Sequence, residues 1–366
     1  MSETKRLSAP VAPGGTIGIL GGGQLGRMLA LAAARLGLRT HIYSDEADAP
    51  AFDVAFAHTL APYDDKTALA AFARACDAAT FEFENVPAET AQFVAERVAL
   101  NPGVRALALL QDRLDEKNFI ASLGLQTPKF FDVSSPETAR AAFAEIGGAS
   151  VLKTRRFGYD GKGQARAQSG DEAAHAFAEF QGAPAILEAF VDFTCEVSII
   201  AARSQDGDFV AYDSPENVHE NHILRRSTVP SRLDGDQQNA AKAIARKIAE
   251  GLGYIGVLAV ELFVAKDGSL LVNEVAPRVH NSGHWTLEAC LVSQFEQHIR
   301  AVCGWPLGET ERHADAVMEN IIGEEAANWQ RLSESCGALH LYGKKAIRPG
   351  RKMGHVTRLG PKTSAR

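Results

Sequence analysis

Two glutamates in neighbouring apolar runs are the residues whose type and spacing most clearly suggest chemistry. Glu261 lies in GVLAVELFV and Glu274 in SLLVNEV, and both runs are rich in residue types that form β-strands. The segment between them contains Asp267 and Gly268, a pair typical of tight hairpin turns. A turn of these two residues alone would place Glu261 and Glu274 directly opposite each other.

Such a carboxylate pair needs a positive partner. Like charges opposite each other in a sheet are destabilising, and an unpaired carboxylate is costly to bury. A divalent cation held by both would offset this, because Mg²⁺ takes one or two protein carboxylates and completes its shell with substrate phosphates. The pair therefore predicts a Mg²⁺ site, open also to Mn²⁺, with Glu261 and Glu274 as ligands. A longer turn would instead shift the register and leave carboxylates in solvent, and Asn273 adds an oxygen only if a bulge turns it.

A glycine-rich segment, FGYDGKGQA, follows a strand expected at 150–154. Three glycines in six residues let backbone N–H groups approach a phosphate closely, and Lys162 adds positive charge at the tip. The segment is not a P-loop, because Gly163 is followed by Gln164 and not by Lys and then Ser or Thr. It predicts a flap over a triphosphate, with a flexible surface hairpin as the alternative.

The elements that must position these residues fall into three groups. The first hundred residues alternate apolar runs with alanine-rich helical segments, a βαβ pattern. Strands dominate the last half of the chain. Helices are expected near 24–36, 67–76, 112–123, 137–145, 171–181, 237–252 and 287–302. The expected organisation is a flexible tail at 1–13, a Rossmann-like domain at 14–110, a lid lobe at 111–185 and a larger nucleotide- and metal-binding domain at 186–366.

Composition narrows the class of protein. The chain has 366 residues, 46% hydrophobic and 23% charged, which is typical of a soluble multidomain protein. Apolar runs are too short for a membrane span, and the N-terminus lacks a secretory core. Five scattered cysteines favour the reducing cytoplasm, and a net charge of −7 argues against nucleic acid as the main partner.

Two further motifs leave alternatives open. The fingerprint Gly21-x-Gly23-x-x-Gly26, with Asp45 further on, is also typical of dinucleotide binding, and a plain packing role for the glycines is the simpler interpretation. The segment KKAIRPGRK at 344–352 has five basic residues in nine. Such a cluster is a solvated face, a nucleic-acid patch or a site for one phosphate group.

Taken together, these segments resemble the ATP-grasp superfamily and, within it, the 5-(carboxyamino)imidazole ribonucleotide synthetases. The resemblance spans about residues 17–355 and is carried by GILGGGQLGRM, FEFENV, QDRLDEK, KTRRFGYDGKGQ, Glu188 with Glu196, NVHENHILRRS, the carboxylate hairpin and APRVHNSGHWT. It implies a mixed α/β and α+β ATP-grasp fold. It also implies a cytoplasmic, homodimeric C–N ligase that uses ATP and bicarbonate to carboxylate 5-aminoimidazole ribonucleotide through carboxyphosphate.

The resemblance also implies roles for individual residues. Arg278, His280 and Lys153 would be catalytic, with the fixed charge of Arg278 holding bicarbonate. The positions implied for ATP are Arg113, Lys153, Gly158, Tyr159, Asp160, Gly161, Lys162, Gly163, Gln164, Glu188, Ala189, Phe190, Val191, Glu196, His219, Asn273 and Glu274. The positions implied for the ribonucleotide are Gln24, Leu25, Glu82, Tyr159, Asp160, Asn281, Ser282, Lys344, Arg351 and Lys352.

Other functions remain open at this point. His280 and His284 have the spacing of a zinc pair, but Pro277 and Gly283 indicate a loop and not the helix that such a pair needs. A formate-using ATP-grasp enzyme that formylates glycinamide ribonucleotide would have the same metal and nucleotide sites. The glycine fingerprint suggests a nicotinamide-dependent oxidoreductase, and a nucleotide-binding regulatory protein is the non-enzymatic alternative.

Overall fold

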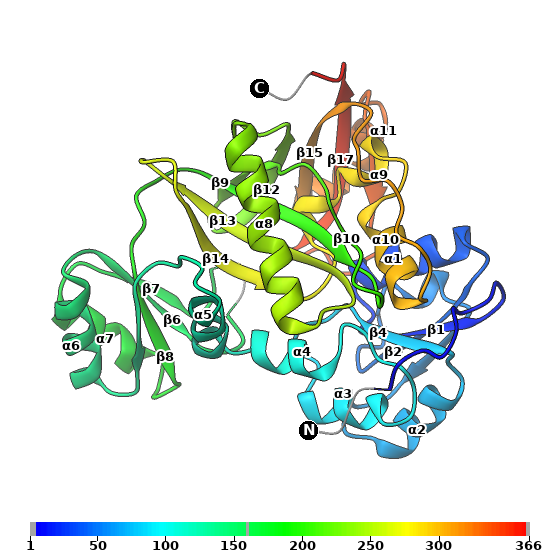
Figure 1. Ribbon diagram of the computed structural model, residues 1–366, viewed down its shortest axis with the longest axis horizontal. Coiled ribbons are helices and arrows are strands. Elements are labelled where there is room, and N and C mark those ends of the chain that lie inside the picture. The colour runs from blue at the N-terminus through cyan, green and yellow to red at the C-terminus, as the bar shows by residue number, and fades with distance from the viewer. Residues whose placement is uncertain (1–4, 159–160, 364–366) are drawn as a thin grey trace.

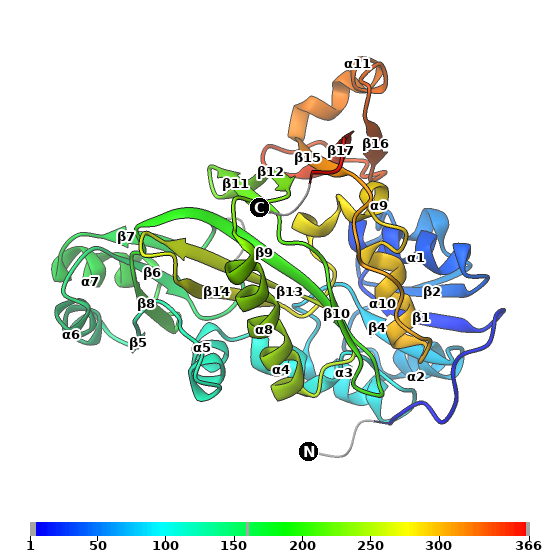
Figure 2. The same cartoon turned by 45° about the horizontal axis from the view of Figure 1, so that its top comes forward.

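The computed structural model describes residues 5–158 and 161–363, which form three parts (Figure 1). A parallel sheet is built from the N-terminal residues, and a large antiparallel sheet forms the body. A small antiparallel sheet stands to one side of the body in both ribbon views (Figures 1 and 2). None of the helices in the described ranges has the length and apolarity needed to cross a membrane.

The N-terminal part is a four-stranded parallel sheet in the order β3-β2-β1-β4, which confirms the expected βαβ pattern. Apolar side chains of α1 pack on one face, and those of α2 and α3 pack on the other. Its elements are β1 (Thr16–Leu20), α1 (Gln24–Arg35), β2 (Arg39–Ser44), η1 (Phe52–Val54), β3 (Ala57–Leu60), α2 (Lys66–Arg74), β4 (Ala78–Phe81), α3 (Ala88–Ala95) and α4 (Val104–Leu110).

The lid lobe is a four-stranded antiparallel sheet in the order β5-β8-β6-β7, with two helices against it. Helix α6 begins at a capping box formed by Ser135 and Thr138 and ends at Gly147, whose positive φ suits glycine. The elements are β5 (Phe130–Val133), α6 (Pro136–Ile146), β6 (Ser150–Thr154), β7 (Gln164–Ala167), α7 (Gly170–Glu179) and β8 (Ala185–Ala189).

The edges of the lid lobe differ from the expected range 111–185. Helix α5 (Arg113–Ser122) packs through Ile120 into the core beneath α8, so it contributes to the body. Strand β8 continues to Ala189 within the lid sheet, because its apolar side chains fill the lid core.

The body is a nine-stranded antiparallel sheet in the order β14-β13-β9-β11-β12-β15-β17-β16, with β10 paired to β9. Helix α8 covers one face of its first strands, and α10 covers the other. The elements are β9 (Phe193–Arg203), β10 (Phe209–Ala211), β11 (Glu216–Glu220), β12 (Ile223–Val229), α8 (Gly235–Leu252), β13 (Gly256–Ala265), β14 (Leu270–Ala276), η2 (Asn281–Gly283), α9 (Thr286–Ala289), α10 (Gln294–Val302), β15 (Asp315–Ile322), η3 (Gly323–Asn328), α11 (Trp329–Ser333), β16 (Ala338–Leu341) and β17 (Lys352–Gly360).

The sequence predicted one helix near 287–302, and this prediction is wrong. Two helices, α9 and α10, occupy the segment. Cys290 is extended and forms a β-bridge with Arg312, and the Ser293 side chain caps a new helix by accepting the N–H of Glu296.

The expected flexible tail covers residues 1–13, of which 5–13 are described. Val11 donates its N–H to the Cys303 carbonyl at 2.9 Å, and its own carbonyl accepts from Trp305 Nε1 at 2.7 Å. Leu7 packs against the core behind α10. This part of the tail is therefore held by the body, because its apolar side chains have a surface to cover.

His298 of α10 joins the N-terminal sheet to the body. Its Nδ1 accepts the N–H of Val257 at 3.0 Å, which leaves Nε2 to donate to Thr80 Oγ1 of β4 at 2.7 Å. The ring is completely buried, and burial lowers the pKa of His298 to about 4. The junction therefore requires the neutral imidazole.

Acid should loosen this junction. Unfolded histidine takes up a proton near pH 6.5, whereas folded His298 stays neutral down to about pH 4. The contribution of His298 to the free energy of unfolding is therefore fully present above pH 6.5 and is lost as the pH is lowered toward 4. From pH 7 to 5 His298 should lower the free energy of unfolding by about 2 kcal/mol. Urea unfolding of His298→Gln should lack this component of the pH dependence. The exposed His313→Gln should keep it, and an unchanged slope in His298→Gln would contradict the assignment.

Candidate active site

The two glutamates of the hairpin lie directly opposite each other. The ladder between β13 and β14 pairs Glu261 with Glu274, as predicted. The two-residue turn is wrong, because Ala265 and Ser269 still pair and the loop has three residues. The longer loop shifts the pairing by one residue, and a bulge at Asn273 in β14 adds one unpaired residue that shifts it back before Glu274. Two departures from a regular hairpin thus cancel.

The carboxylates of the pair differ in their surroundings. Burial and the charge of Glu274 raise the pKa of Glu261 to about 7. Burial also acts to raise the pKa of Glu274, but the Arg113 guanidinium, 3.0 Å away, outweighs it and the pKa lies below its ordinary value. At neutral pH Glu274 is an anion balanced by Arg113, while Glu261 is held near its titration point by its neighbour.

The donor set suits a hard divalent cation that shares its shell with a substrate. Asn273 Oδ1 is buried beside the pair without a hydrogen-bond partner in the described part of the chain, so it offers a third oxygen. Across residues 5–158 and 161–363, no cluster of three or more His, Cys, Asp or Glu side chains is arranged to hold a metal alone. Phosphate oxygens would have to complete the shell.

A cluster of two lysines and a glutamate lies where the lid joins the body. Glu188 Oε2 lies 2.9 Å from Lys153 Nζ and 3.7 Å from Lys117 Nζ. Burial opposes the charge of Glu188, but the two lysines outweigh it and lower its pKa to about 2. The ion pair with Glu188 thereby fixes the position of the Lys153 ammonium group where the lid meets the body.

Lys117 was missed from the sequence. It is fully buried on α5, and its Nζ donates to the Asn273 carbonyl at 2.7 Å, which fixes the bulge from behind. The neighbouring Glu116 accepts the N–H of Val275 at 2.5 Å. Both belong to QDRLDEK, and a signal existed, because Glu116 and Ile120 are one turn apart on the buried side of a helix.

The glycine flap starts beside the carboxylates. Arg113 donates to Glu274 and, through Nη2, to the carbonyl of Gly158 at 3.2 Å. Gly161 and Gly163 have φ of 81° and 68°, which side chains rarely adopt. Gln164 contacts His222 of the β11–β12 turn at 3.0 Å. The described flap residues also include Lys162, whereas Tyr159 and Asp160 lie outside the described residues.

The residues predicted for the base and ribose lie along β8, β9 and β11. Glu188 and Ala189 end the lid strand, and Phe190 and Val191 follow in the connection to the body. Glu196 of β9 and His219 of β11 are brought together, with His219 Nδ1 bonded to the Glu196 carboxylate. Burial would lower the pKa of His219, but Glu196 outweighs burial and raises it.

Residues 277–285, from the motif APRVHNSGHWT, form a loop that follows β14 and contacts both the N-terminal part and the carboxylate pair. Arg278 Nη2 lies 2.7 Å from Glu84 Oε2, near the N-terminal sheet. His280 Nε2 lies 3.4 Å from Glu261 Oε1, and its Nδ1 lies 2.9 Å from Ser282 Oγ. Burial and nearby positive charge lower the pKa of His280 well below 6.5, so the imidazole is neutral. The loop thus spans the space between the Glu261–Glu274 pair and the N-terminal part.

Asn281 and Ser282 secure this loop. The Asn281 amide exchanges two hydrogen bonds with Asn320, at 2.9 and 2.7 Å, which occupies both of its polar ends. Ser282 Oγ bonds to Ser198 Oγ of β9 at 2.7 Å as well as to His280. Their side chains are thus engaged with the protein.

Glu82 closes the glycine turn of the N-terminal part. It accepts the N–H of Gly23 at 2.7 Å, and a Cβ at Gly21 would lie 2.7 Å from its Oε1. Burial raises the pKa of Glu82, against the pull of the Gly23 N–H and the charges of Arg278 and Lys344. The Glu82 carboxylate therefore takes the Gly23 N–H group that a dinucleotide-binding turn would donate to the pyrophosphate of its ligand. Gln24 and Leu25 follow at the start of α1.

The basic segment 344–352 lies near this turn. Lys344 Nζ donates to the Lys352 carbonyl at 2.7 Å, and Arg351 donates to the Ala346 carbonyl at 2.9 Å. Burial and the positive charge of Arg351 lower the pKa of Lys344 to about 8. Lys352 also raises the local potential at His219, Glu261 and His280. Positive charge is therefore concentrated where an anion would be stabilised.

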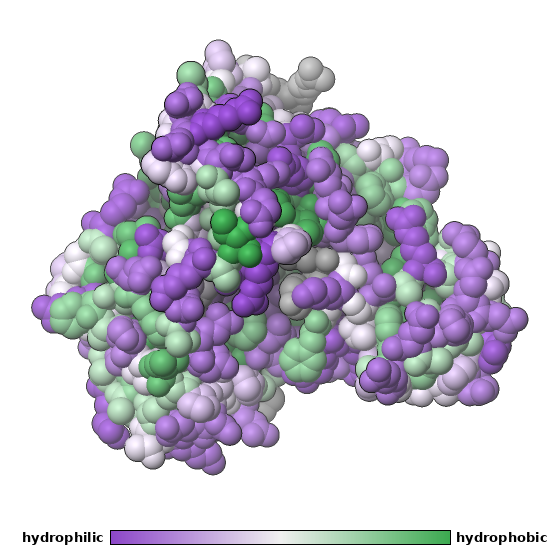
Figure 3. All heavy atoms as spheres, turned by 180° about the vertical axis from the view of Figure 1, so that it is seen from behind, coloured by the Kyte–Doolittle hydropathy of each residue, from purple (hydrophilic) through white to green (hydrophobic). Residues whose placement is uncertain are grey.

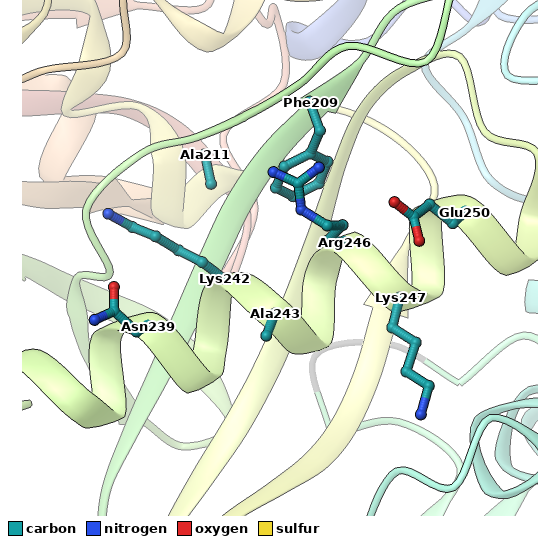
Figure 4. Close-up of a pocket in the computed structure, with 8 residues that line it drawn as sticks. All are labelled: Phe209, Ala211, Asn239, Lys242, Ala243, Arg246, Lys247 and Glu250. Carbon is teal, nitrogen blue, oxygen red and sulfur yellow. The ribbon is translucent and has the colours of Figure 1, made fainter.

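The shape of the molecular surface is compatible with a site between the lid lobe and the body. Viewed from behind, the lid lobe stands away from the body and the surface is indented between them (Figure 3). A cavity of about 450 Å³ lies elsewhere, between α8 and β10, lined by Lys242, Arg246 and Phe209 among others (Figure 4). Because α8 packs on Val260 and Val272, that cavity is on the opposite face of the sheet from Glu261.

Three family models match successive segments of the chain. Residues 15–111 match the ribonucleotide synthetase preATP-grasp domain, and residues 118–295 match the ATP-grasp domain. Residues 316–366 match the phosphoribosylaminoimidazole carboxylase C-terminal domain.

Whole-chain comparisons agree with the family models. An N5-carboxyaminoimidazole ribonucleotide synthase of Brucella melitensis is 53% identical over 96% of this chain and 98% of its own length. The chain belongs to the N5-carboxyaminoimidazole ribonucleotide synthase family. The crystal structure of the Thermus thermophilus enzyme is 44% identical, with a TM-score of 0.89 over 94% of each chain. The Aspergillus clavatus enzyme, solved with ADP and 5-aminoimidazole ribonucleotide, is 29% identical, with a TM-score of 0.87 over 95% of this chain and 94% of that one.

Membership of this family confirms two predictions, the ATP-grasp fold and an ATP-dependent ligase. The oxidoreductase alternative rested on the glycine fingerprint, whose Gly23 N–H is taken by Glu82. The relatives are synthases of the carboxylating type, which also argues against the formate-using and regulatory alternatives.

Removing one carboxylate of the pair should stabilise the metal-free protein. Because the pKa of Glu261 is raised to about 7, its contribution to stability is lost as pH rises from 4.5 to 7. Glu261→Gln should therefore raise the free energy of unfolding at pH 8 by about 1 to 3 kcal/mol. Urea unfolding in EDTA measures this. Glu319→Gln, which breaks an exposed pair with Arg358, is the control and should change stability little. A destabilised Glu261→Gln would contradict the assigned repulsion.

Proposed function

We propose that this chain carboxylates 5-aminoimidazole ribonucleotide with bicarbonate at the expense of ATP. The observation that carries the proposal is the position of loop 277–285. Its His280 contacts Glu261 on the nucleotide side, and its Arg278 contacts Glu84 on the side of the glycine turn. Bicarbonate bound beside this loop would lie between the γ-phosphate of ATP and the ribonucleotide.

Glu261 and Glu274 are proposed to hold Mg²⁺, or Mn²⁺, with help from Asn273 Oδ1. Bound there, the cation would neutralise charge on the phosphates of ATP during phosphoryl transfer. The pair suits this role because its two carboxylates repel each other without a cation.

Positive side chains are proposed to orient the nucleotide. Lys153, directed by Glu188, and Arg113, which contacts Glu274 and Gly158, lie where the lid meets the body. They would hold the β- and γ-phosphates in line with the attacking oxygen. Residues 188–191 would contact the adenine edge, and Glu196 with His219 would contact the ribose and its neighbouring phosphate.

The reaction proceeds in two steps. A bicarbonate oxygen, held by Arg278, bonds to the γ-phosphorus as the bond to ADP breaks, which gives carboxyphosphate. The exocyclic nitrogen of the aminoimidazole then bonds to the carboxyl carbon, and the bond from that carbon to the phosphate oxygen breaks. Inorganic phosphate leaves and takes up the proton that the amine loses. Neutral His280 is suited to donate from Nε2 to the reacting carboxyl oxygens. Because carboxyphosphate reacts readily with water, the flap would also exclude solvent.

The ribonucleotide is proposed to lie between the glycine turn and the basic segment. Gln24, Leu25 and Glu82 would contact the base and sugar, and Lys344, Arg351 and Lys352 the 5′-phosphate. Asn281 and Ser282 shape the wall of this site, since their side chains bond to Asn320 and Ser198. Tyr159 and Asp160 stay predicted contacts.

We also propose a cytoplasmic homodimer that uses small molecules and not nucleic acid as its partners. The five free cysteines accord with a reducing compartment, and the family resemblance supports a dimer. Sedimentation of the purified protein measures the oligomeric state directly.

ADP release with defined substrates tests the reaction. ADP should accumulate when ATP, Mg²⁺, bicarbonate and aminoimidazole ribonucleotide are all present, and Glu274→Gln should abolish it while the protein stays folded by circular dichroism. ADP formation that requires formate and glycinamide ribonucleotide would favour the transformylase. NADH binding without a thermal shift by ATP would favour the oxidoreductase, and absence of ADP with every acid and amine would favour a regulatory protein.

Two adjacent lysines test the phosphate site. Lys344→Met should raise KM for aminoimidazole ribonucleotide by about 30-fold, the loss of one charge-assisted contact of about 2 kcal/mol, and leave KM for ATP unchanged. Lys345 is exposed and pairs with Asp48, so Lys345→Met is the matched control and should match wild type. Equal effects of the two substitutions would show a general charge effect and contradict the assignment.

A further inference from the structure

Gln294, the first residue of α10, holds the backbone of His280 on both sides. Its Oε1 accepts the His280 N–H at 2.9 Å, and its Nε2 donates to the His280 carbonyl at 2.7 Å. The side chain is completely buried. The Gln294 amide thus pairs with both the N–H and the carbonyl group of His280. In a sheet a neighbouring strand would supply these two hydrogen bonds, but a loop has no such strand.

The orientation of this amide is fixed by its partners. A backbone N–H can only donate and a carbonyl can only accept, so a flipped amide would oppose both. The second proton of Nε2 then faces His284 Nδ1 at 3.1 Å, which makes that nitrogen an acceptor. Both amide protons of Gln294 are therefore used within the loop.

The loop is in close van der Waals contact with the Gln294 side chain. A Cβ at Gly283 would lie 2.7 Å from Gln294 Oε1, so only glycine fits there. The backbone N–H of Gln294 donates to Thr286 Oγ1 at 3.0 Å, and Thr286 Oγ1 donates to the Gly283 carbonyl at 2.6 Å. The start of α10 and the turn after His280 thus form one unit.

This unit determines where the His280 ring lies. Ser282, itself bonded to Ser198, contacts Nδ1, and Nε2 then faces Glu261 at 3.4 Å. We propose that Gln294 is a positioning residue for the carboxylation, and that its amide holds the His280 imidazole toward the reacting groups. The inference rests on the proposed function, in which His280 touches the carboxyl group being transferred.

The same helix contains a matched control. Gln297 is also completely buried, and its amide binds both the N–H and the carbonyl of Gly308, each at 2.8 Å. Gly308 lies in the loop before β15, so the Gln297 amide is directed away from loop 277–285. Replacing either glutamine by methionine removes the same kind of paired contact from the same helix, so the two variants separate positioning from stability.

Gln294→Met and Gln297→Met should be compared with wild type under saturating ATP, bicarbonate and aminoimidazole ribonucleotide. Gln294→Met should lower kcat by about 100-fold and leave KM for ATP unchanged, because a displaced catalytic group affects the reaction more than nucleotide binding. Gln297→Met should keep the wild-type kcat, although its thermal unfolding midpoint should fall by about as much as that of Gln294→Met. Equal losses of kcat in the two variants, or none in Gln294→Met, would overturn the proposal.

A second measurement does not depend on activity. Nitrogen NMR of protein labelled in its histidines reports ring hydrogen bonding, and the signals of His280 and His284 should shift in Gln294→Met but not in Gln297→Met. Unshifted signals would overturn the positioning role. If the signals shift while wild type forms no ADP with bicarbonate and aminoimidazole ribonucleotide, the proposed function fails and the amide contact stands.

Discussion

Repulsion between Glu261 and Glu274 is the constraint on which the site depends. The two carboxylates are paired across adjacent strands, and the pKa of Glu261 is raised to about 7 by burial and by that pairing. Arg113 balances one of the two charges. The remaining negative potential, with the Asn273 oxygen beside it that has no partner among the described residues, is a place where a divalent cation on a phosphate chain would be stabilised.

The surrounding parts of the fold follow from this constraint. Lys117 on α5 fixes the bulge from behind, and Lys153 approaches from the lid, both balanced by Glu188. The loop after β14 then carries His280 from the carboxylates toward the glycine turn. Charges of opposite sign therefore alternate across the junction of the three parts, which is how several buried ions can coexist in one site.

Sequence reasoning reached local features and missed distant ones. The facing of Glu261 and Glu274 was predictable because strand pairing near a turn is local, although the three-residue loop and the bulge at Asn273 compensated for each other. The family resemblance supplied the fold. The helical pattern of 113–122 indicated a buried face that includes Lys117, but the partners of Lys117 and of Gln294 could not be found, because only the fold brings them together. The break between α9 and α10 was hidden by an apolar pattern that suits one helix.

Binding of Mn²⁺ in the presence of a non-hydrolysable ATP analogue tests directly whether Glu261 and Glu274 hold a metal, because Mn²⁺ reports its own binding by electron paramagnetic resonance. We expect nucleotide-dependent binding of Mn²⁺ to wild type at pH 8, and its loss in the double variant Glu261→Gln, Glu274→Gln with the fold retained. Mn²⁺ bound equally well by the double variant would contradict the claim that this carboxylate pair holds the metal.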